Sequence, residues 1–180
     1  MITSVDDEIK ALRSSIVDVP NFPKRGVTFR DVTPMLAKPR MLSTAVRLMG
    51  RPWWTAMDSV AGIESRGFVL ASALAFDDKC GLHLLRKPGK LPPPTERRDY
   101  SLEYGRDALE LKGGVVRPGE RVLLVDDVLA TGGTAVAAVE LLRAAGAKVI
   151  GAAFLMELKD LKGRAALEAA DVTVTAVLKY

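Results

Sequence analysis

The sequence predicts an α/β fold with a mostly parallel central sheet flanked by helices. Short apolar runs typical of buried strands alternate with longer segments of helical periodicity. Two of these runs, residues 59–63 and 122–125, are each followed by a polar turn that leads into a helical segment. Strands alternating with helices favour parallel pairing with right-handed crossovers, so functional side chains are expected where the strands end.

Composition indicates one globular domain spanning residues 1–180. The chain is 48% hydrophobic and 27% charged, which is enough for a sizeable core. A net charge of +4 suits anionic ligands, but no block of like charge favours nucleic acid. The single cysteine, Cys80, excludes an intramolecular disulfide and fits a reducing cytoplasm. Neither a signal region nor a membrane-spanning apolar run is present, so we expect a cytoplasmic protein without membrane contact.

The N-terminal segment predicts a helix followed by a loop and an extended piece. Ser4 is a suitable N-cap, and apolar residues recur at helical spacing until Pro20 is expected to end the helix. A loop over residues 20–27 then leads to an extended piece over residues 27–32. This piece carries Phe29 beside Arg30. Phe29 is either a core residue or an aromatic platform for a flat heterocycle.

The next segment predicts two helices around the first strand of the sheet. Thr33 precedes a proline in a pattern typical of a cap and first turn, and a helix follows over residues 41–49. The strand at residues 59–63 leads through a polar turn into a small apolar helix over residues 68–75. Arg66, in that turn, is placed to meet an anion.

A second strand, residues 80–85, is followed by basic residues and a long irregular segment. His83 lies within the apolar run and predicts a structural histidine. The basic run 86–90 can meet phosphates at the end of the strand. Residues 88–107 hold four prolines, and two alternating arms around Gly105 predict a β-hairpin. Such a segment in a compact domain is typical of a lid.

The most informative stretch begins with the buried strand 122–125. Asp126 and Asp127 are expected at its carboxyl end, and a Gly-rich turn then leads into a helix over residues 134–145. Glycines let a backbone approach a phosphate, and carboxylates accept hydrogen bonds from vicinal hydroxyls. Phosphate plus diol suggests a ribose 5-phosphate. Further along, the sequence predicts a strand, a short helix and a last strand, at residues 148–156, 161–169 and 172–178.

Residues 123–134 resemble the phosphoribosyl pyrophosphate (PRPP) signature of the type I phosphoribosyltransferases. Three further strings, within residues 22–31, 61–68 and 86–105, are similar to the adenine-specific branch of that family. The resemblance covers nearly the whole chain. It implies transfer of a phosphoribosyl group from PRPP to adenine, giving AMP and pyrophosphate. It also implies an N-terminal hood over residues 1–34, a flexible lid over residues 88–112 and a homodimer.

The same resemblance implies roles for individual residues. Adenine would be bound by Thr28, Phe29, Arg30 and Leu158. Pyrophosphate would be held by Arg66, Lys87 and Lys90, and the 5-phosphate by Ala130, Thr131, Gly132, Gly133 and Thr134. Asp126 and Asp127 would fix the ribose, Glu103 would handle a proton near the base, and Tyr104 would help to close the site. Mg²⁺ would be chelated by substrate oxygens and water, with no direct protein ligand.

The sequence departs from the family pattern in one segment, and two alternative functions fit it. Residues 92–99 are richer in proline and charge than the family pattern. The resemblance therefore does not imply how flexible the lid is. A PRPP-sensing regulator that binds nucleic acid is one alternative, although the sequence shows no helix-turn-helix ahead of the domain. The other alternative is a phosphoribosyltransferase that uses a 6-oxopurine.

Overall fold

A computed structural model describes residues 4–102 and 105–180. The chain divides into two compact units, residues 1–48 and 49–180, and each is described on its own. The first unit extends past the 1–34 segment that the sequence suggested as a hood. Whether that segment acts as a hood stays a prediction.

The first unit begins with α1 (Val5–Arg13), and Ser4 is its N-cap, as predicted. Ser4 Oγ accepts a hydrogen bond from the Asp7 backbone N–H at 3.1 Å, which satisfies a helix-end donor. The expectation that this helix continues toward Pro20 is wrong. It ends at Arg13 because the following residues form β1 (Val17–Pro20), which pairs antiparallel with β2 (Thr28–Asp31).

Two helices complete this part of the chain, α2 (Thr33–Leu36) and α3 (Met41–Gly50). The predicted cap at Thr33 is displaced by one residue, since the N-cap is Val32. The Thr33 backbone N–H instead donates to Asp31 Oδ1 at 2.9 Å. The pattern therefore located the helix but misplaced its first residue.

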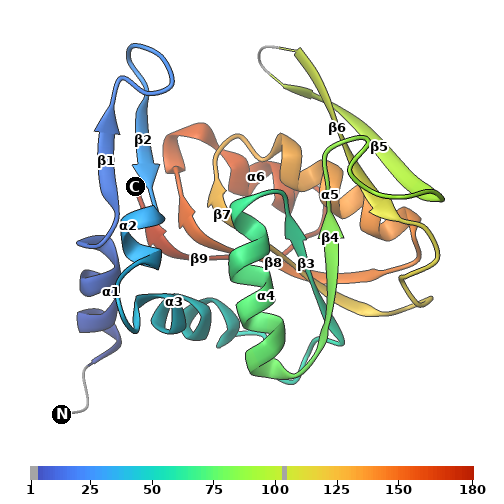
Figure 1. Ribbon diagram of the computed structural model, residues 1–180, viewed down its shortest axis with the longest axis horizontal. Helices are drawn as coiled ribbons and strands as arrows, with labels where there is room; N and C mark the ends of the chain where they lie inside the picture. The colour runs from blue at the N-terminus through green and yellow to red at the C-terminus, as the bar shows by residue number, and fades with distance from the viewer. Residues whose placement is uncertain (1–3, 103–104) are drawn as a thin grey trace. The chain divides into compact units, whose positions relative to one another are not determined.

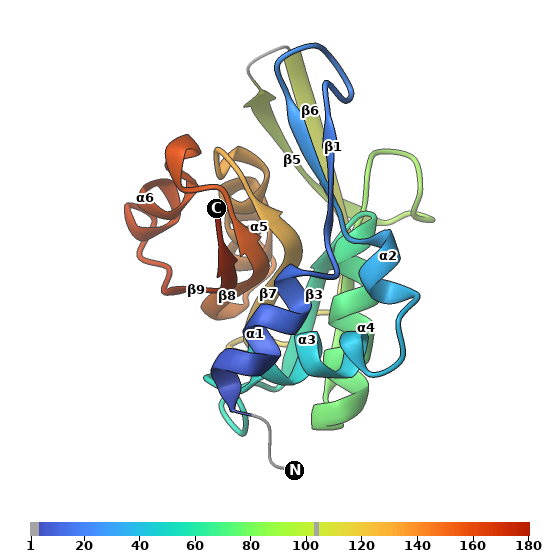
Figure 2. The same cartoon turned by 90° about the vertical axis from the view of Figure 1, so that its left-hand side faces the viewer.

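The second unit contains a parallel five-stranded sheet in the order β4-β3-β7-β8-β9, which confirms the predicted fold class. On one side of the sheet lies α4, and α5 and α6 lie on the other (Figure 2). The connection from β3 to β4 runs in one direction along the sheet, and the connections from β7 to β8 and β9 run in the other. Because both kinds of connection are right-handed, their helices lie on opposite faces. The bounds are β3 (Ser59–Ile63), α4 (Arg66–Asp78), β4 (Gly81–Leu85), β7 (Arg121–Leu129), α5 (Gly133–Ala144), β8 (Lys148–Glu157), the 3₁₀ turn Lys159–Leu161, α6 (Gly163–Glu168) and β9 (Val174–Lys179).

The predicted hairpin is present as β5 (Thr95–Leu102) and β6 (Gly105–Lys112), and it projects from the second unit (Figure 1). Its first strand begins at Thr95, within the segment that the sequence suggested was irregular. A second correction concerns β7. The strand was expected to end before Asp126, but pairing with β8 continues to Leu129, so both aspartates lie within the strand.

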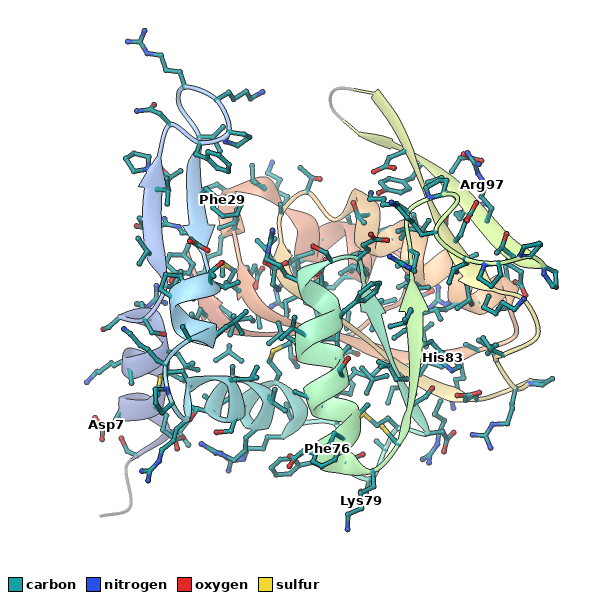
Figure 3. All side chains as sticks on the ribbon, in the orientation of Figure 1. Asp7, Phe29, Phe76, Lys79, His83 and Arg97 are labelled. Atoms are coloured by element: carbon teal, nitrogen blue, oxygen red, sulfur yellow. The ribbon has the colours of Figure 1, made fainter. Side chains whose placement is uncertain are left out.

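Two features of the second unit lie away from the aspartates. His83, labelled in Figure 3, is buried on β4, and its Nε2 lies 2.9 Å from Glu120 Oε1. Trp53 packs over Gly151, and its indole N–H donates to Thr175 Oγ1 at 3.0 Å. Across residues 4–102 and 105–180, no helix is both long enough and apolar enough to cross a membrane.

Candidate functional site

A pocket of about 310 Å³ lies in the second unit, at the carboxyl ends of β3 and β7. Its lining comes from residues 63–66, Lys87 and residues 126–135. Three separate segments that the sequence singled out are therefore brought together. They supply Arg66, Lys87, Asp126, Asp127 and the whole turn Ala130–Thr134.

The turn after β7 has the geometry of an anion site. Gly132 has φ +87° and is the N-cap of α5, so the turn delivers the helix N-terminus to the pocket. A Cβ atom on Gly132 would lie 2.9 Å from the Gly163 carbonyl oxygen. A Cβ atom on Gly163 would lie 2.3 Å from the Ala130 carbonyl oxygen. The turn thus requires glycine both within it and in the α6 residue beneath it.

The two aspartates have different environments. Asp127 is 3% exposed, and its Oδ2 accepts a 2.5 Å hydrogen bond from Arg66 Nε. Asp126 Oδ1 accepts the Asp127 backbone N–H at 2.9 Å. Burial, and then the neighbouring Asp127 carboxylate, raise the pKa of Asp126 well above its ordinary range.

Close packing places the Asp126 carboxyl group against the start of α4. A Cβ atom on Gly67 would lie 2.8 Å from Asp126 Oδ1 and 3.0 Å from the Val125 carbonyl oxygen. Glycine at the start of α4 therefore lets the helix approach β7 directly beside the carboxyl group. No local pattern in the sequence marked this contact.

The basic segment after β4 is fixed in place by Glu64. Glu64 Oε2 accepts the Lys87 backbone N–H at 2.9 Å and the Arg86 Nε at 3.2 Å. Burial acts to raise the pKa of Glu64, but these hydrogen bonds outweigh it and leave the pKa lowered. Glu64 is therefore an anionic anchor for the segment that carries Lys87. The pocket lining includes Lys87 but not Lys90.

The residues suggested for the base lie in both units. Thr28, Phe29 and Arg30 are on β2 in the first unit, and Leu158 follows β8 in the second. The Phe29 ring makes an edge-on contact with Phe22, with centroids 5.3 Å apart, and Figure 3 shows Phe29 on its strand. Their common role in a base pocket stays a prediction. Glu103 and Tyr104 lie outside the described residues.

Sequence reasoning missed the carboxylates that hold the cationic side chains. Glu64 anchors the basic segment, and Asp107 on β6 forms an ion pair with Lys87. The polar turn that contains Arg66 gave a weak signal for Glu64. Asp107 gave none, because its partner is 20 residues away along the chain.

Carboxylate side chains are the candidate ligands for a metal ion at this site. Among residues 4–102 and 105–180, no group of three or more histidine, cysteine, aspartate or glutamate side chains could hold one. Asp126 and Asp127 do supply carboxylate oxygens at the pocket. Such oxygens fit a hard cation that keeps most of its ligands as water or substrate oxygens, as Mg²⁺ does.

Comparisons with known proteins agree with this geometry. Residues 48–178 match the family described as phosphoribosyl transferase domain. The adenine phosphoribosyltransferase of Rhizobium johnstonii is 46% identical over 177 residues, which cover 98% of each chain. The crystal structure of adenine phosphoribosyltransferase from Rhodothermus marinus has a TM-score of 0.91 and 43% identity, covering 97% of this chain and 99% of that one. The Saccharomyces cerevisiae enzyme, solved with adenine and an imino-altritol bisphosphate, has a TM-score of 0.90 and 32% identity, covering 96% and 99%.

Proposed function

This chain belongs to the phosphoribosyltransferase family, and we propose that it converts adenine and PRPP into AMP and pyrophosphate. The observation that carries the proposal is the pocket at the ends of β3 and β7. It combines a helix N-terminus and Gly-rich turn with the carboxylates of Asp126 and Asp127 and the two cations Arg66 and Lys87. These groups match the phosphate, diol and pyrophosphate of PRPP. Relatives named adenine phosphoribosyltransferase over nearly the full length support adenine as the acceptor base.

The turn Ala130–Thr134 would bind the 5-phosphate of PRPP. Its backbone N–H groups and the two threonine hydroxyls can converge on phosphate oxygens, and the α5 N-terminus favours negative charge. Arg66, Lys87 and Lys90 would hold the pyrophosphate. Their charge would stabilise the leaving group as the bond at the anomeric carbon breaks.

Asp126 and Asp127 would fix the ribose hydroxyls. Asp127 is paired with Arg66, so binding PRPP would transfer Arg66 to pyrophosphate and leave Asp127 to bind the diol. Asp127 would then place negative charge near the cationic carbon of an oxocarbenium-like transition state. Adenine N9 would attack from the face opposite the leaving group, with inversion.

We propose Mg²⁺ as the cofactor. When bound, it would neutralise charge on the pyrophosphate leaving group. Asp126 and Asp127 are the nearest candidate anchors, through water or through the ribose hydroxyls that they bind.

The base would be read by the backbone and side chains around Phe29, with Thr28, Arg30 and Leu158 completing its pocket. Backbone groups can distinguish the exocyclic amine of adenine from the oxygen of a 6-oxopurine, because an unmatched buried polar group is costly. Glu103 would handle the base proton, and Tyr104 would help to exclude water. Both roles are carried by the family resemblance alone.

We also propose a homodimer that works in the cytoplasm. The Trp and Met residues near α3 are mostly buried, including Met49, Trp53 and Met57. Phe76 on α4, labelled in Figure 3, is instead 87% exposed, and Val69, seven residues earlier, is 42% exposed. These two exposed apolar side chains are a better candidate for the contact. Light scattering on the wild type and on Phe76→Ser would test it, and an unchanged mass would place the interface elsewhere.

A base panel tests the reaction directly. Purified protein, Mg²⁺ and PRPP would be mixed with adenine, hypoxanthine, guanine or xanthine, and both nucleotide and pyrophosphate would be followed. Product with adenine alone is expected. Product only with a 6-oxopurine would keep the chemistry and overturn the base assignment, and PRPP binding without any product would support a sensing role.

A further inference from the structure

Two residues of the hairpin hold the side chain of Lys87. Its Nζ donates to Tyr100 Oη at 3.0 Å and forms an ion pair with Asp107 Oδ2. Tyr100 Oη also donates to Asp107 Oδ2 at 3.0 Å. Tyr100 on β5 and Asp107 on β6 are directly opposite in the hairpin register, so their side chains share one face. The hairpin thus presents an acceptor site for the Lys87 ammonium group.

This cluster borders the pocket. Lys87 and Thr134 both line it, and Thr134 Oγ1 lies 3.4 Å from Tyr100 Oη. Burial acts to lower the pKa of Lys87, but its bonds to Asp107 and Tyr100 outweigh this effect and leave the pKa raised. The pKa of Asp107 is lowered, since the same bonds outweigh its own burial. Both groups are therefore charged at neutral pH, and the lysine charge that faces the pocket is already compensated.

We propose that Asp107 sets the affinity for PRPP by competing with its pyrophosphate group for the Lys87 ammonium. The inference rests on the function proposed above, in which Lys87 binds pyrophosphate. Asp107 is a positioning residue, because it acts on the substrate through Lys87. Pyrophosphate and the Asp107 carboxylate are both anions, so they compete for the Lys87 ammonium group. The free energy needed to break the Lys87–Asp107 ion pair therefore reduces the free energy of PRPP binding.

The backbone around Lys87 does not depend on Asp107. Glu64 accepts the Lys87 backbone N–H, and Arg86 and Glu110 exchange two backbone hydrogen bonds of 2.8 and 2.7 Å. The Gly89 backbone N–H donates to Glu110 Oε2 at 3.0 Å. Removing the charge of Asp107 therefore releases the ammonium group while the segment that carries it stays anchored.

The test compares Asp107→Asn with a matched control, Asp99→Asn. Asp99 is on the same hairpin, exposed and paired with Arg97, and it opposes Ala108, one position from the Tyr100–Asp107 pair. Both variants lose one negative charge, but only the first frees Lys87. Asparagine keeps an oxygen that can accept the Ala108 N–H, which Asp107 Oδ1 binds at 2.8 Å. Asp107→Glu keeps the charge and serves as the conservative variant.

Calorimetry with inorganic pyrophosphate in Mg²⁺ buffer, and KM for PRPP, are the readouts. Asp107→Asn is expected to bind both ligands about 3- to 10-fold more tightly, a size typical of a partly exposed ion pair. KM for adenine should not change, Asp99→Asn should stay within about twofold of the wild type, and Asp107→Glu should restore wild-type affinity. If Asp107 had only a structural role, its replacement would not strengthen pyrophosphate binding while leaving KM for adenine unchanged.

Weaker or unchanged pyrophosphate binding in Asp107→Asn would overturn the inference. If the asparagine variant does not fold, Asp107→Ser, which also offers an oxygen to the Ala108 N–H, takes its place under the same criteria. In a Lys87→Gln background, removing Asp107 should lose most of its effect, as expected for two directly coupled residues. An inactive wild type that binds no PRPP would instead refute the proposed function. An active wild type without tighter binding in the variant refutes the inference alone.

Discussion

Replacing Gly132 by alanine should perturb both the phosphate turn and the stability of the fold. Gly132 has φ +87°, a conformation that residues with a Cβ atom rarely adopt. Its Cβ atom would also meet the Gly163 carbonyl oxygen at 2.9 Å, and the Ala166 Cβ and Gly163 Cα atoms both at 3.1 Å. The substitution therefore adds backbone strain and a steric conflict with α6.

The two effects can be given separate magnitudes. A positive φ in a residue other than glycine costs about 1–2 kcal/mol. Overpacking against backbone atoms costs about 1–3 kcal/mol. The sum of about 2–5 kcal/mol is a large part of the stability of an ordinary domain, and it corresponds to a fall in Tm of about 2–4 °C per kcal/mol.

Gly119→Ala is the matched control, because Gly119 has φ +77° but no atom within 4 Å of the position that a Cβ atom would take. It should lose only the backbone contribution of about 1–2 kcal/mol. Denaturant unfolding of both variants would measure the difference, which isolates the contact with Gly163. Relief of the conflict shifts the turn, so Gly132→Ala should also raise KM for PRPP by at least about tenfold, while Gly119→Ala should not. Equal stability losses would refute the steric argument, and an unchanged KM would refute the placement of the 5-phosphate.

Three further predictions concern carboxyl groups. Burial acts to raise the pKa of Glu120, but contacts that include the His83 hydrogen bond hold it at about 2, against an ordinary 4.5. The resulting stability, at most about 3 kcal/mol, is present above about pH 5 and lost as pH falls towards 2, so the unfolding free energies of wild type and Glu120→Gln should converge in acid. The raised pKa of Asp126 means that stability falls as pH rises above the unfolded value of 3.8. Asp126→Asn should therefore raise Tm at pH 8 more than at pH 4, yet lower kcat about 100-fold; no gain in Tm would contradict the raised pKa of Asp126. Glu103→Gln should lower kcat more than it raises KM for adenine, and unchanged turnover would remove Glu103 from the mechanism.

The architecture could be predicted because strand and helix signals are local. The run 59–63 matches β3 at both ends, and the hairpin was evident from alternating residues around a glycine. Element ends were less predictable, because they depend on partners. The β7 strand continues through Asp126 only because β8 pairs with it as far as Leu129, and α1 stops at Arg13 because the next residues pair with β2.

In the candidate site, residues that form one contiguous motif could be predicted, but residues that meet only through the fold could not. Asp126 and the turn after it form one contiguous string, so their common location needed no tertiary information. Asp107 could not be found in this way, since its contact with Lys87 depends on the hairpin register. Gly163 supports the turn from α6 without any motif of its own. The cis peptide bond between Glu64 and Ser65 likewise has no sequence signal, because neither residue is proline.

The number of basic residues near the pocket does not indicate how strongly the pocket attracts an anion, because these residues are already paired with carboxylates. In the second unit Arg66 is paired with Asp127, Lys87 with Asp107, and Arg86 with Glu64. A substrate with several phosphates would therefore bind by exchange, taking a cation from a carboxylate that the protein itself provides. At Asp127 the exchange would be productive, because the freed carboxylate can then bind the ribose diol. At Asp107 the freed carboxylate gains no such partner, so the same exchange there would reduce affinity.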